Sequence, residues 1–460
     1  MLNTYLKSRI VDAKKLVKEL RKEYEYVSVL GSAVNTKQIN VSTHINSINE
    51  IDSECGFVIK VYKDGRYSEY SCNDIRGLKA GDVCKSIKLN KIVSDDFKVK
   101  MLQEETLTKN YLREDKNALT DKQIIDALTN VKTKLEKQDK RLINFVSRYV
   151  KRQTSKIFVS DKKCLTQKYD WINVIQVNVV RDKDNIKDAY CAQGECDSKL
   201  ALSKFEKNAS NLLDLAIKKL DAKPIKPGKY TIITDPSISG LIAHEAFGHG
   251  VEMDMFVKNR AKAKDYVGKY VASNIVDMFD GAASCISAAS YFFDDDGVLA
   301  HNTQIIKKGI LQTGISDCLS AMELGTTPTG NGRRESYQRK VYTRMTNTFF
   351  GPGKDKYEDM IKSVKYGYLL CQTNNGMEDP KNWQIQCTAE YGLEIKDGKF
   401  TGKMVSPVVI SGYVIDLLSS ISMVSDKVQV IGSGMCGKGH KEWVYVSDGG
   451  PYLKAEARLG

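Results

Sequence analysis

Two of the five histidines in the chain lie five positions apart and enclose a glutamate directly after the first, in the run His244-Glu245-Ala246-Phe247-Gly248-His249. Chance seldom produces this HExxxH pattern in a chain with so few histidines. Neutral imidazoles are good zinc ligands, and an adjacent carboxylate can act as a base toward a zinc-bound water whose pKa has fallen to about 7. The pattern therefore predicts zinc-dependent hydrolysis, against the simpler alternative of two core histidines beside a surface acid.

The spacing of His244 and His249 does not suit a regular helix. Positions i and i+5 lie about 140° apart around an α-helix, so the two imidazoles would face different sides. A π-bulge can absorb the extra residue, and Gly248 is a suitable place for it or for an early helix end. We therefore expect a local irregularity from Ala246 to His249.

A catalytic zinc needs a third protein ligand, with water in the fourth position. Glu252 and Asp254 follow closely after His249. Either could be a carboxylate ligand of the metal, or could hydrogen-bond a ligand without binding the metal itself. Cys436 is the other candidate, because it lies in a glycine-lined run at 434–439 where a thiolate can approach a metal without steric obstruction. From the chemistry alone, Cys436 is only slightly favoured.

The segment that carries the histidines, residues 228–460, is predicted to be β-rich. A linker at 223–228 leads to a strand at 230–234 and then to a short helix that would hold the metal ligands. Beyond it, short β candidates alternate with Gly, Asp and Asn turns, including the hairpin signals Asp296-Gly297 and Asp397-Gly398. We therefore expect a β-rich domain around one short metal-binding helix.

Residues 1–227 predict helices packed on antiparallel strands, in an N-terminal α+β domain over 1–110 and a middle α+β segment over 111–227. Helices are expected at 3–25, 121–139 and near 200–220. The fold class expected for the whole chain is α+β. The second helix has its apolar stripe at Ile124, Leu128, Val131 and Leu135. Strands are predicted at 26–30, 38–43, 57–62, 67–72, 142–150, 156–160 and 171–181.

The composition excludes several classes of protein. With 460 residues, 42% apolar and 28% charged, the chain is not disordered or of low complexity. Its apolar runs are too short for a membrane span and its first 25 residues lack the core of a signal peptide, so we expect a cytoplasmic protein without a membrane partner. Eleven Cys without regular spacing do not predict a disulfide framework. The net charge of +13 is spread along the chain, which favours a Lys-rich surface over a nucleic-acid partner.

Residues 244–252, His-Glu-Ala-Phe-Gly-His-Gly-Val-Glu, resemble the HEAxGHGxE signature of the TldD branch of the TldD/PmbA metallopeptidase family. Further matches follow in the family's order through the C-terminal half. They are Thr-Gly-Asn-Gly-Arg-Arg-Glu-Ser at 329–336, Arg-Met-Thr-Asn-Thr at 344–348 and Met-Cys-Gly-Lys at 435–438. The N-terminal region resembles the family more loosely, by its helix-then-sheet layout and its Asp64-Gly65 hairpin.

The resemblance implies a zinc metallopeptidase in which His244, His249 and Cys436 bind Zn²⁺ and Glu245 is catalytic. It further implies action on small or unfolded peptides inside an enclosed dimer cavity. The dimer would form with a second copy or with a PmbA-like sister subunit that lacks the HExxxH motif. The chain departs from the family's pattern at His440, where the family usually continues toward Gln, so His440 is a further candidate ligand.

In the mechanism that these roles imply, zinc polarises the scissile carbonyl, and Glu245 takes a proton from the zinc-bound water and passes it to the leaving amine. Arg333, Arg334 and Arg344 lie in or beside the matched runs, where a guanidinium can hold a peptide carboxylate. The alternative for these arginines is structural ion pairing or a dimer contact. The alternatives for the whole chain are a zinc hydrolase of a non-peptide amide and a non-catalytic partner subunit with a structural zinc.

Overall fold

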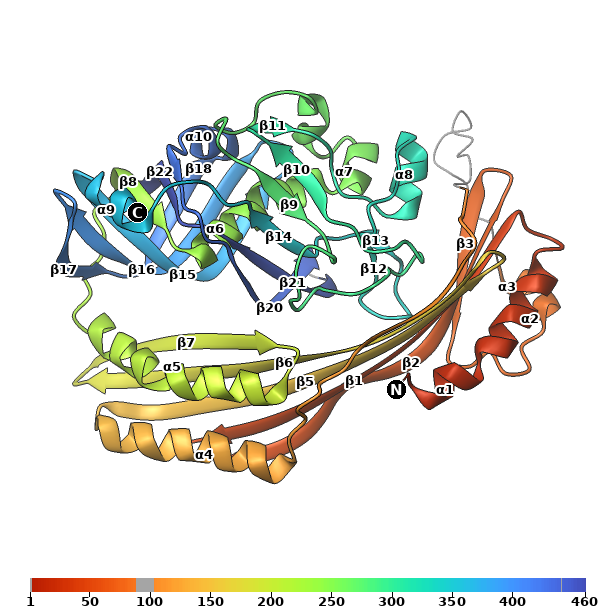
Figure 1. Ribbon diagram of the computed structural model, residues 1–460, viewed down its shortest axis with the longest axis horizontal. Helices are drawn as coiled ribbons and strands as arrows, with labels where there is room; N and C mark the ends of the chain where they lie inside the picture. The colour runs from red at the N-terminus through yellow and green to blue at the C-terminus, as the bar shows by residue number, and fades with distance from the viewer. Residues whose placement is uncertain (1, 88–102, 440) are drawn as a thin grey trace.

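A long, curved seven-stranded sheet forms the N-terminal half of the computed structural model, which describes residues 2–87, 103–439 and 441–460 (Figure 1). Its strand order is β3-β2-β1-β5-β6-β4, and β7 also pairs with β6. The strands are β1 (Tyr26–Ser42), β2 (Asn46–Lys63), β3 (Arg66–Cys72), β4 (Leu107–Arg113), β5 (Leu142–Ser160), β6 (Lys163–Asp182) and β7 (Asn185–Glu195).

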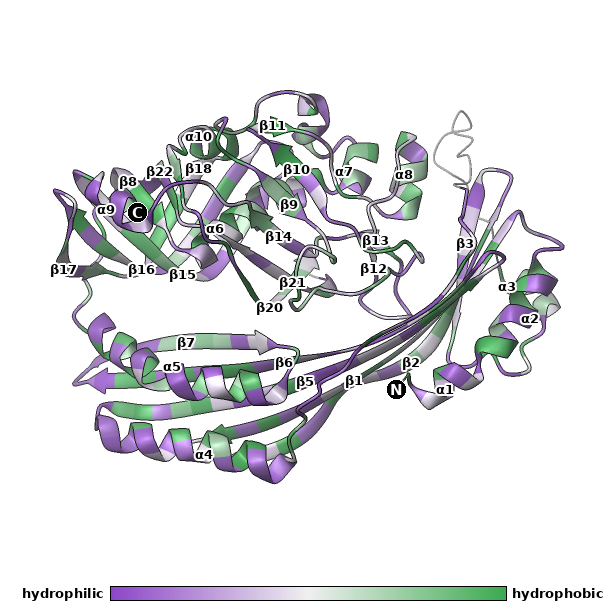
Figure 2. Ribbon diagram, in the orientation of Figure 1, coloured by the Kyte–Doolittle hydropathy of each residue, from purple (hydrophilic) through white to green (hydrophobic). Residues whose placement is uncertain are grey.

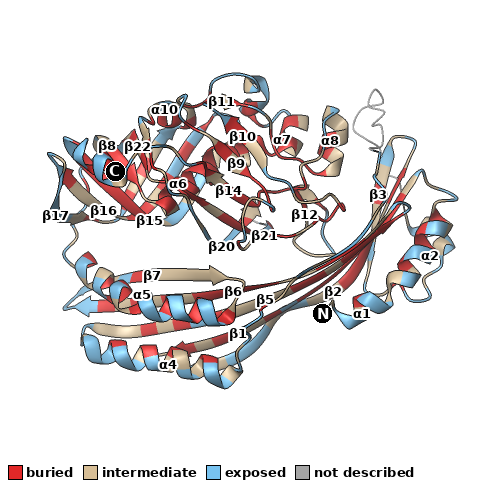
Figure 3. Cartoon of the chain, in the orientation of Figure 1, coloured by how far each residue is buried: buried red, intermediate tan, exposed pale blue. Residues whose placement is uncertain are grey.

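Helices cover one face of this sheet. The short helices α1 (Thr4–Ser8) and α2 (Ile10–Leu20) pack over one end, and α4 (Asp121–Gln138) and α5 (Ser198–Lys219) over the other (Figure 1). The predicted stripe of α4 is confirmed, because all four of its apolar residues are buried. Its outer face is exposed and largely hydrophilic (Figures 2 and 3). The remaining helix of this half is α3 (Ala80–Ser86).

Alternate residues of the long strands face different neighbours. Val29 of β1 and Ile157 of β5 belong to the apolar cluster under α1 and α2, whereas Leu30 and Phe158 pack with Phe293 of the C-terminal half. Successive side chains of a strand point to opposite faces, so the sheet is buried on both sides here. The sheet thereby forms a platform on which the C-terminal half lies.

The C-terminal half contains two larger sheets and a two-stranded ribbon. One sheet has the order β11-β10-β9-β14-β21-β20, and the other, β15-β8-β22-β18-β16-β17, closes on itself because β15 also pairs with β16. The strands of the first sheet are β9 (Met278–Asp280), β10 (Thr303–Lys307), β11 (Ile310–Leu311), β14 (Asn347–Phe350), β20 (Gln429–Lys438) and β21 (Lys441–Gly450). Those of the second are β8 (Gly228–Thr234), β15 (Tyr366–Asp379), β16 (Gln384–Lys396), β17 (Lys399–Val405), β18 (Val408–Tyr413), β19 (Met423–Val424) and β22 (Leu453–Leu459), and the ribbon is β12 (Gly332–Arg333) and β13 (Tyr342–Thr343).

A short helix, α6 (Pro236–Ala243), lies between these sheets, against β14, β15, β20 and β21. It continues into a π-helical turn (His244–Gly248) and a 3₁₀ turn (His249–Val251). The other helices are α7 (Met253–Val257), α8 (Cys318–Leu324), α9 (Tyr357–Lys362), α10 (Val414–Ser419) and a 3₁₀ turn (Lys262–Tyr266). The expected α+β class, with a β-rich C-terminal part around a short helix, is confirmed.

Two features of the N-terminal half differ from the sequence prediction. The helix expected over 3–25 is broken at Arg9, whose side chain donates a 3.0 Å hydrogen bond to Asp74, and α2 ends at Leu20. The strands predicted at 26–30 and 38–43, and those at 142–150 and 156–160, are pieces of the single strands β1 and β5. Polar residues such as Lys156, which pairs with Asp295 of the C-terminal half, interrupt the apolar alternation without ending the strand.

The proposed division of the chain at residues 110 and 227 stays a prediction. Strands from both 1–110 and 111–227 hydrogen-bond within the one N-terminal sheet. Within the ranges that the structure describes, no helix combines the length and the apolar character that a bilayer crossing requires.

Candidate metal centre

Local capping and strand contacts fix where α6 begins. Asp235 accepts a hydrogen bond from the backbone N–H of Ile238 at 2.8 Å, and Pro236 occupies the first turn, where no intrahelical N–H partner is needed. The other carboxylate oxygen of Asp235 accepts from the N–H of Gln372 in β15 at 3.0 Å. The helix start is therefore tied to the closed sheet, and its C-terminal end carries His244.

The expected irregularity between the two histidines is confirmed as a π-helical turn. The backbone N–H of His249 donates to the carbonyl of His244, five residues earlier, and the imidazole centroids lie 5.0 Å apart. Gly248 packs closely against Met345, because a Cβ there would lie 2.1 Å from Sδ of Met345 and would make this buried side chain shift. The wider turn thus brings together two rings that a regular α-helix would separate.

Cys436 of β20 approaches both rings from a segment 192 residues away from His244. Its Sγ lies 3.3 Å from Nε2 of His244 and 3.2 Å from Nε2 of His249. Zinc bonds of about 2.0 to 2.3 Å in a tetrahedron place neighbouring donor atoms roughly 3.3 to 3.8 Å apart. The three donor atoms lie within 4.8 Å of one another and form the metal-ligand group that the described residues contain. Their geometry and chemistry fit a zinc ion.

The surroundings favour the metal-binding form of the thiol. Burial by itself raises the pKa of Cys436, but the neighbouring His244 and His249 lower it to about 4. Arg344 adds a further positive group, with Nη2 at 3.1 Å from the sulfur. A thiolate is the form of cysteine that binds a metal, so the sulfur is prepared for coordination at neutral pH.

Residues 227–457, half of the chain, match the family model of the PmbA/TldA metallopeptidase C-terminal domain. The chain belongs to the PmbA/TldD metallopeptidase family.

Curated relatives of this family carry names of the same kind. A metalloprotease of Methanocaldococcus jannaschii is 33% identical over 55% of this chain and 57% of its own length. A metalloprotease TldD homolog of Buchnera aphidicola is 31% identical over 57% of this chain and 54% of its own length. A zinc metalloprotease TldD homolog of Saccharolobus solfataricus is 30% identical over 54% and 55%. The chain thus matches little more than half the length of these relatives.

Solved structures share the fold over almost the whole chain. A crystal structure from Thermotoga maritima has a TM-score of 0.78 at 18% identity and covers 98% of this chain and 100% of its own. The structure of TldE from Thermococcus kodakarensis has a TM-score of 0.72 at 17% identity, with coverages of 98% and 100%. At this identity the likeness establishes the fold alone.

Glu252 of the family signature lies behind His249 and outside the three-donor group. Its Oε2 is 3.7 Å from Nδ1 of His249 and accepts from Nζ of Lys438 at 2.6 Å, and its Oε1 is 3.3 Å from Nε of Arg344. Burial raises the pKa of Glu252, but Lys438, His249 and Arg344 together hold it well below its usual range. A carboxylate behind a metal-binding histidine fixes the orientation of the ring.

The other candidate ligands lie elsewhere. Asp254 pairs with Lys438 at 2.9 Å and with Lys258 at 3.2 Å. His440 lies outside the described residues. Lys438 also belongs to this site. The sequence did not predict its role, although it is the last residue of the Met-Cys-Gly-Lys run. A lysine two positions after a ligand could have indicated a cation near the signature glutamate.

Glu245 is the acid of the HExxxH signature and is 7% exposed. Its side chain lies against β15, since a Cβ on Gly376 would be 2.6 Å from Cγ and 2.9 Å from Oε1 of Glu245. Among the described residues its carboxylate has no hydrogen bond or ion pair. The carboxylate therefore lies next to the candidate ligand His244 without a competing partner in the described part of the chain.

Of the three arginines considered for substrate contact, Arg344 and Arg333 occupy different places. Arg344 is 1% exposed and donates to the carbonyls of Cys436 and Glu442. These contacts agree with the alternative in which Arg344 has a structural role and does not bind substrate. Arg333 is half-buried, donates to the carbonyl of Met345 at 2.6 Å and lines a cavity beside the centre.

Proposed function

We propose that this chain is a zinc-dependent peptidase that hydrolyses peptide bonds of small or unfolded peptides. The observation that carries the proposal is the convergence of His244, His249 and Cys436, from two elements far apart in sequence, on a space of the size that zinc requires. The names of the metalloprotease relatives support the same reaction class. The three residues would hold the zinc, which supplies Lewis acidity toward a carbonyl.

Glu245 is the proposed general base. It follows a candidate ligand directly, lies in a mostly buried position and has no competing partner among the described residues. A carboxylate in such a place removes a proton from the attacking water and returns it to the leaving amine. A purely structural metal site has no use for this group, which argues against a silent partner subunit.

We further propose that the working unit is a dimer around an enclosed cavity. The partner is either a second copy of this chain or a PmbA-like sister subunit. The fold shared with TldE over 98% of this chain supports such a pairing. Mass photometry of the chain alone and mixed with a candidate sister subunit tests it, and a species that stays monomeric in both would contradict the proposal.

Metal content and peptide cleavage test the enzymatic proposal together. We expect about one zinc per chain in the wild type and its loss in Cys436→Ala. We expect Glu245→Gln to keep the zinc and lose cleavage of an unstructured peptide pool by at least about 100-fold, since general base catalysis contributes about 10²- to 10⁴-fold. Cys387→Ala is a matched control, because Cys387 is buried in the same half outside the donor group.

Each other outcome of this experiment points to a stated alternative. Normal turnover by a zinc-loaded Glu245→Gln protein excludes the proposed base. Cleavage of non-peptide amides in preference to peptides points to a different amide hydrolase. Zinc without any cleavage, also in the presence of a sister subunit, supports a structural zinc.

A further inference from the structure

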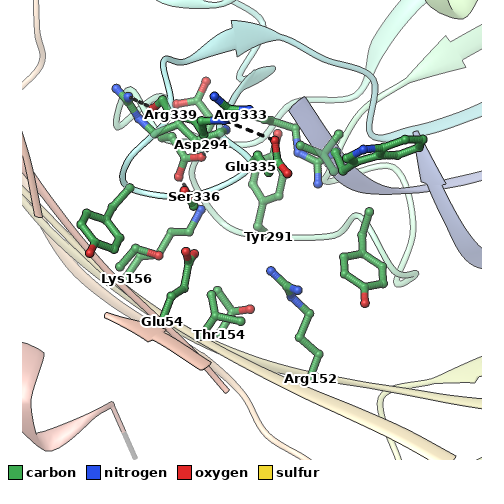
Figure 4. A pocket seen from close by; sticks show the side chains of 18 of the residues that line it. Glu54, Arg152, Thr154, Lys156, Tyr291, Asp294, Arg333, Glu335, Ser336 and Arg339 are labelled. Carbon is green, nitrogen blue, oxygen red and sulfur yellow. Dashed lines mark hydrogen bonds and ion pairs between the residues drawn. The ribbon is translucent and has the colours of Figure 1, made fainter. Parts of the chain in front are cut away.

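A cavity of about 510 Å³ lies between the N-terminal sheet and the C-terminal half (Figure 4). Its floor is formed by the faces of β1, β2, β5 and β6 that point away from the helices, and Glu54 of β2 is among the floor residues. Its roof is formed by the segments 288–295 and 332–339 and by β20 and β21. Both halves of the chain contribute side chains to it, so the cavity exists only in the assembled fold.

Most of the basic side chains of this cavity already have carboxylate partners. Lys156 pairs with Asp295, Arg334 with Glu69 at 2.6 Å, and Arg339 with Glu335 at 3.6 Å. Each of these ion pairs joins one positive and one negative side chain, so the pairs add little net charge to the cavity.

Arg152 and Arg333 are different, because neither has a carboxylate partner within the described part of the chain. The guanidinium of Arg152 lies 4.7 Å from the ring centroid of Tyr445, and that of Arg333 lies 5.6 Å from the ring centroid of Tyr291. Figure 4 shows Arg152 rising from the sheet into the cavity, toward the side that carries Arg333. A guanidinium stacked on an aromatic ring keeps its N–H donors available for a planar anion.

Asp294 of the roof does not neutralise these arginines. Asp294 accepts backbone N–H bonds from Asp296, Val298 and Gly332 at 2.8 to 2.9 Å. Burial and the charge of Asp296 raise its pKa well above the usual range of a carboxyl. The carboxylate of Asp294 therefore binds backbone N–H groups of the roof and pairs with neither guanidinium.

The cavity adjoins the candidate metal centre through two structural links. Met435 and Val444 line it: Met435 precedes Cys436 in β20 and points to the opposite face of the strand, and Val444 is the cross-strand partner of Cys436. Arg333 donates to the carbonyl of Met345, whose side chain packs on Gly248 between the two histidines. The cavity and the three donor atoms thus lie on the two sides of β20, which is the edge strand of its sheet, and an extended peptide, at about 3.3 to 3.6 Å per residue, can connect them past that edge.

We propose that this cavity is a subsite that binds a carboxylate of the peptide substrate through Arg152 and Arg333. The inference rests on the proposed peptidase function and adds a substrate class, peptides that present a carboxylate a few residues from the cleaved bond. The carboxylate has two sources, the C-terminus of the peptide and an Asp or Glu side chain. Both offer the planar pair of oxygens that a guanidinium binds with two hydrogen bonds.

The test measures equilibrium binding, so that it does not depend on turnover. Zinc-loaded full-length protein with Glu245→Gln is titrated into a fluorescent unstructured peptide and followed by anisotropy. Three versions of the peptide share one sequence: a free C-terminal acid, a C-terminal amide, and the amide with one Gln replaced by Glu. We expect at least one carboxylate version to bind about tenfold tighter than the plain amide, the value of one charge-assisted contact.

Arg152→Gln is the deciding variant, because among the described residues the Arg152 side chain has an aromatic contact and no hydrogen bond or ion pair, so we expect the fold to stay intact. We expect it to abolish the preference for the carboxylate, and Arg152→Lys to restore it in part because the charge returns without the planar fork. Arg148→Gln is the matched control, an exposed arginine of the same strand outside the cavity, and it should keep the full preference.

The outcomes separate this proposal from the peptidase proposal. Equal binding of all three peptides by the parent protein overturns the subsite, as does a preference that survives in Arg152→Gln. The identity of the tighter peptide, acid or Glu-containing amide, tells which source of carboxylate is bound. Hydrolysis is measured in parallel on protein with Glu245 intact. Cleavage without carboxylate preference overturns the subsite alone, and Arg152-dependent binding without cleavage supports the subsite and overturns the peptidase.

Discussion

At the scale of single residues, the glutamate of the signature supports the candidate metal site from outside the group of three donor atoms. Glu252 is 2% exposed and meets three cationic or hydrogen-bonding groups, from His249, Arg344 and Lys438. Its charge offsets two buried cations and its position restrains the imidazole of His249. We therefore regard it as a residue that positions a ligand.

Glu252→Gln should weaken zinc binding by about 10- to 100-fold, the usual effect of removing such a supporting carboxylate. The physical reason is that Arg344 and Lys438 lose their counter-charge beside the site. Zinc affinity measured by competition with a chelator checks this expectation. Asp254→Asn is the control, because Lys438 keeps its bond to Glu252 there. Unchanged affinity in Glu252→Gln would show that the ring of His249 needs no such support.

At the scale of elements, the position of α6 depends on contact between two backbones. A Cβ on Gly240 would lie 2.3 Å from the backbone N and 2.7 Å from Cα of Gly449 in β21. Backbone atoms within a sheet cannot move aside as a flexible side chain can. The absence of a side chain at Gly240 therefore sets how closely the helix that ends in His244 approaches the strands.

We predict that Gly240→Ala displaces α6, lowers the free energy of unfolding by about 1 to 3 kcal/mol, and weakens zinc binding although Gly240 is no ligand. Gly250→Ala is the comparison within the same segment, since a Cβ there would have no described atom within 4 Å apart from those of its chain neighbours. We expect it to change stability by less than about 1 kcal/mol. Denaturant unfolding and zinc titration of both variants measure this difference, and equal effects would refute the backbone-contact argument.

At the scale of the whole molecule, buried ion pairs join the two halves of the chain. Glu69 of β3 binds Arg334 through two hydrogen bonds, of 2.6 and 2.8 Å, and lies 3.4 Å from Lys60 of β2. Lys60 in turn pairs with Asp296 of the C-terminal half. Burial raises the pKa of Glu69, but Arg334 and Lys60 lower it to about 2, against a usual value of 4.5.

This lowered pKa predicts a loss of stability in acid. The folded state binds the proton of Glu69 more weakly than the unfolded state, so the contribution is full above about pH 4.5 and disappears as the pH falls toward about 2. Glu69→Gln should destabilise the protein by about 3 kcal/mol at pH 7, because it leaves Arg334 buried without its partner. The difference in the free energy of unfolding between the variant and the wild type should be smaller at pH 3 than at pH 7, as measured by denaturant unfolding. Glu19→Gln, at an exposed pair, should show no such pH-dependent gap.

The sequence by itself determined the features that depend on neighbours in the chain. The burial stripe of α4 follows from its 3.6-residue period, and the π turn follows from two histidines that must share one side at a spacing of five. The HExxxH run and its flanking matches also indicated the family that the comparisons establish. Local periodicity failed for the long strands β1 and β5, because their polar residues have partners far away in the chain: Lys37 of β1 pairs with Asp121, and Lys156 of β5 pairs with Asp295 of the C-terminal half.

Only the tertiary structure decided what meets across long distances. Spacing within a segment could not choose among Cys436, Glu252 and Asp254, whereas the fold places the sulfur of Cys436 against both imidazoles and Glu252 outside that group. It also separated two arginines that looked equivalent, burying Arg344 against the sulfur and leaving Arg333 at a cavity wall. The reason is physical: periodicity reports which face of an element is buried, whereas the partner on that face is set by how the sheets and helices pack.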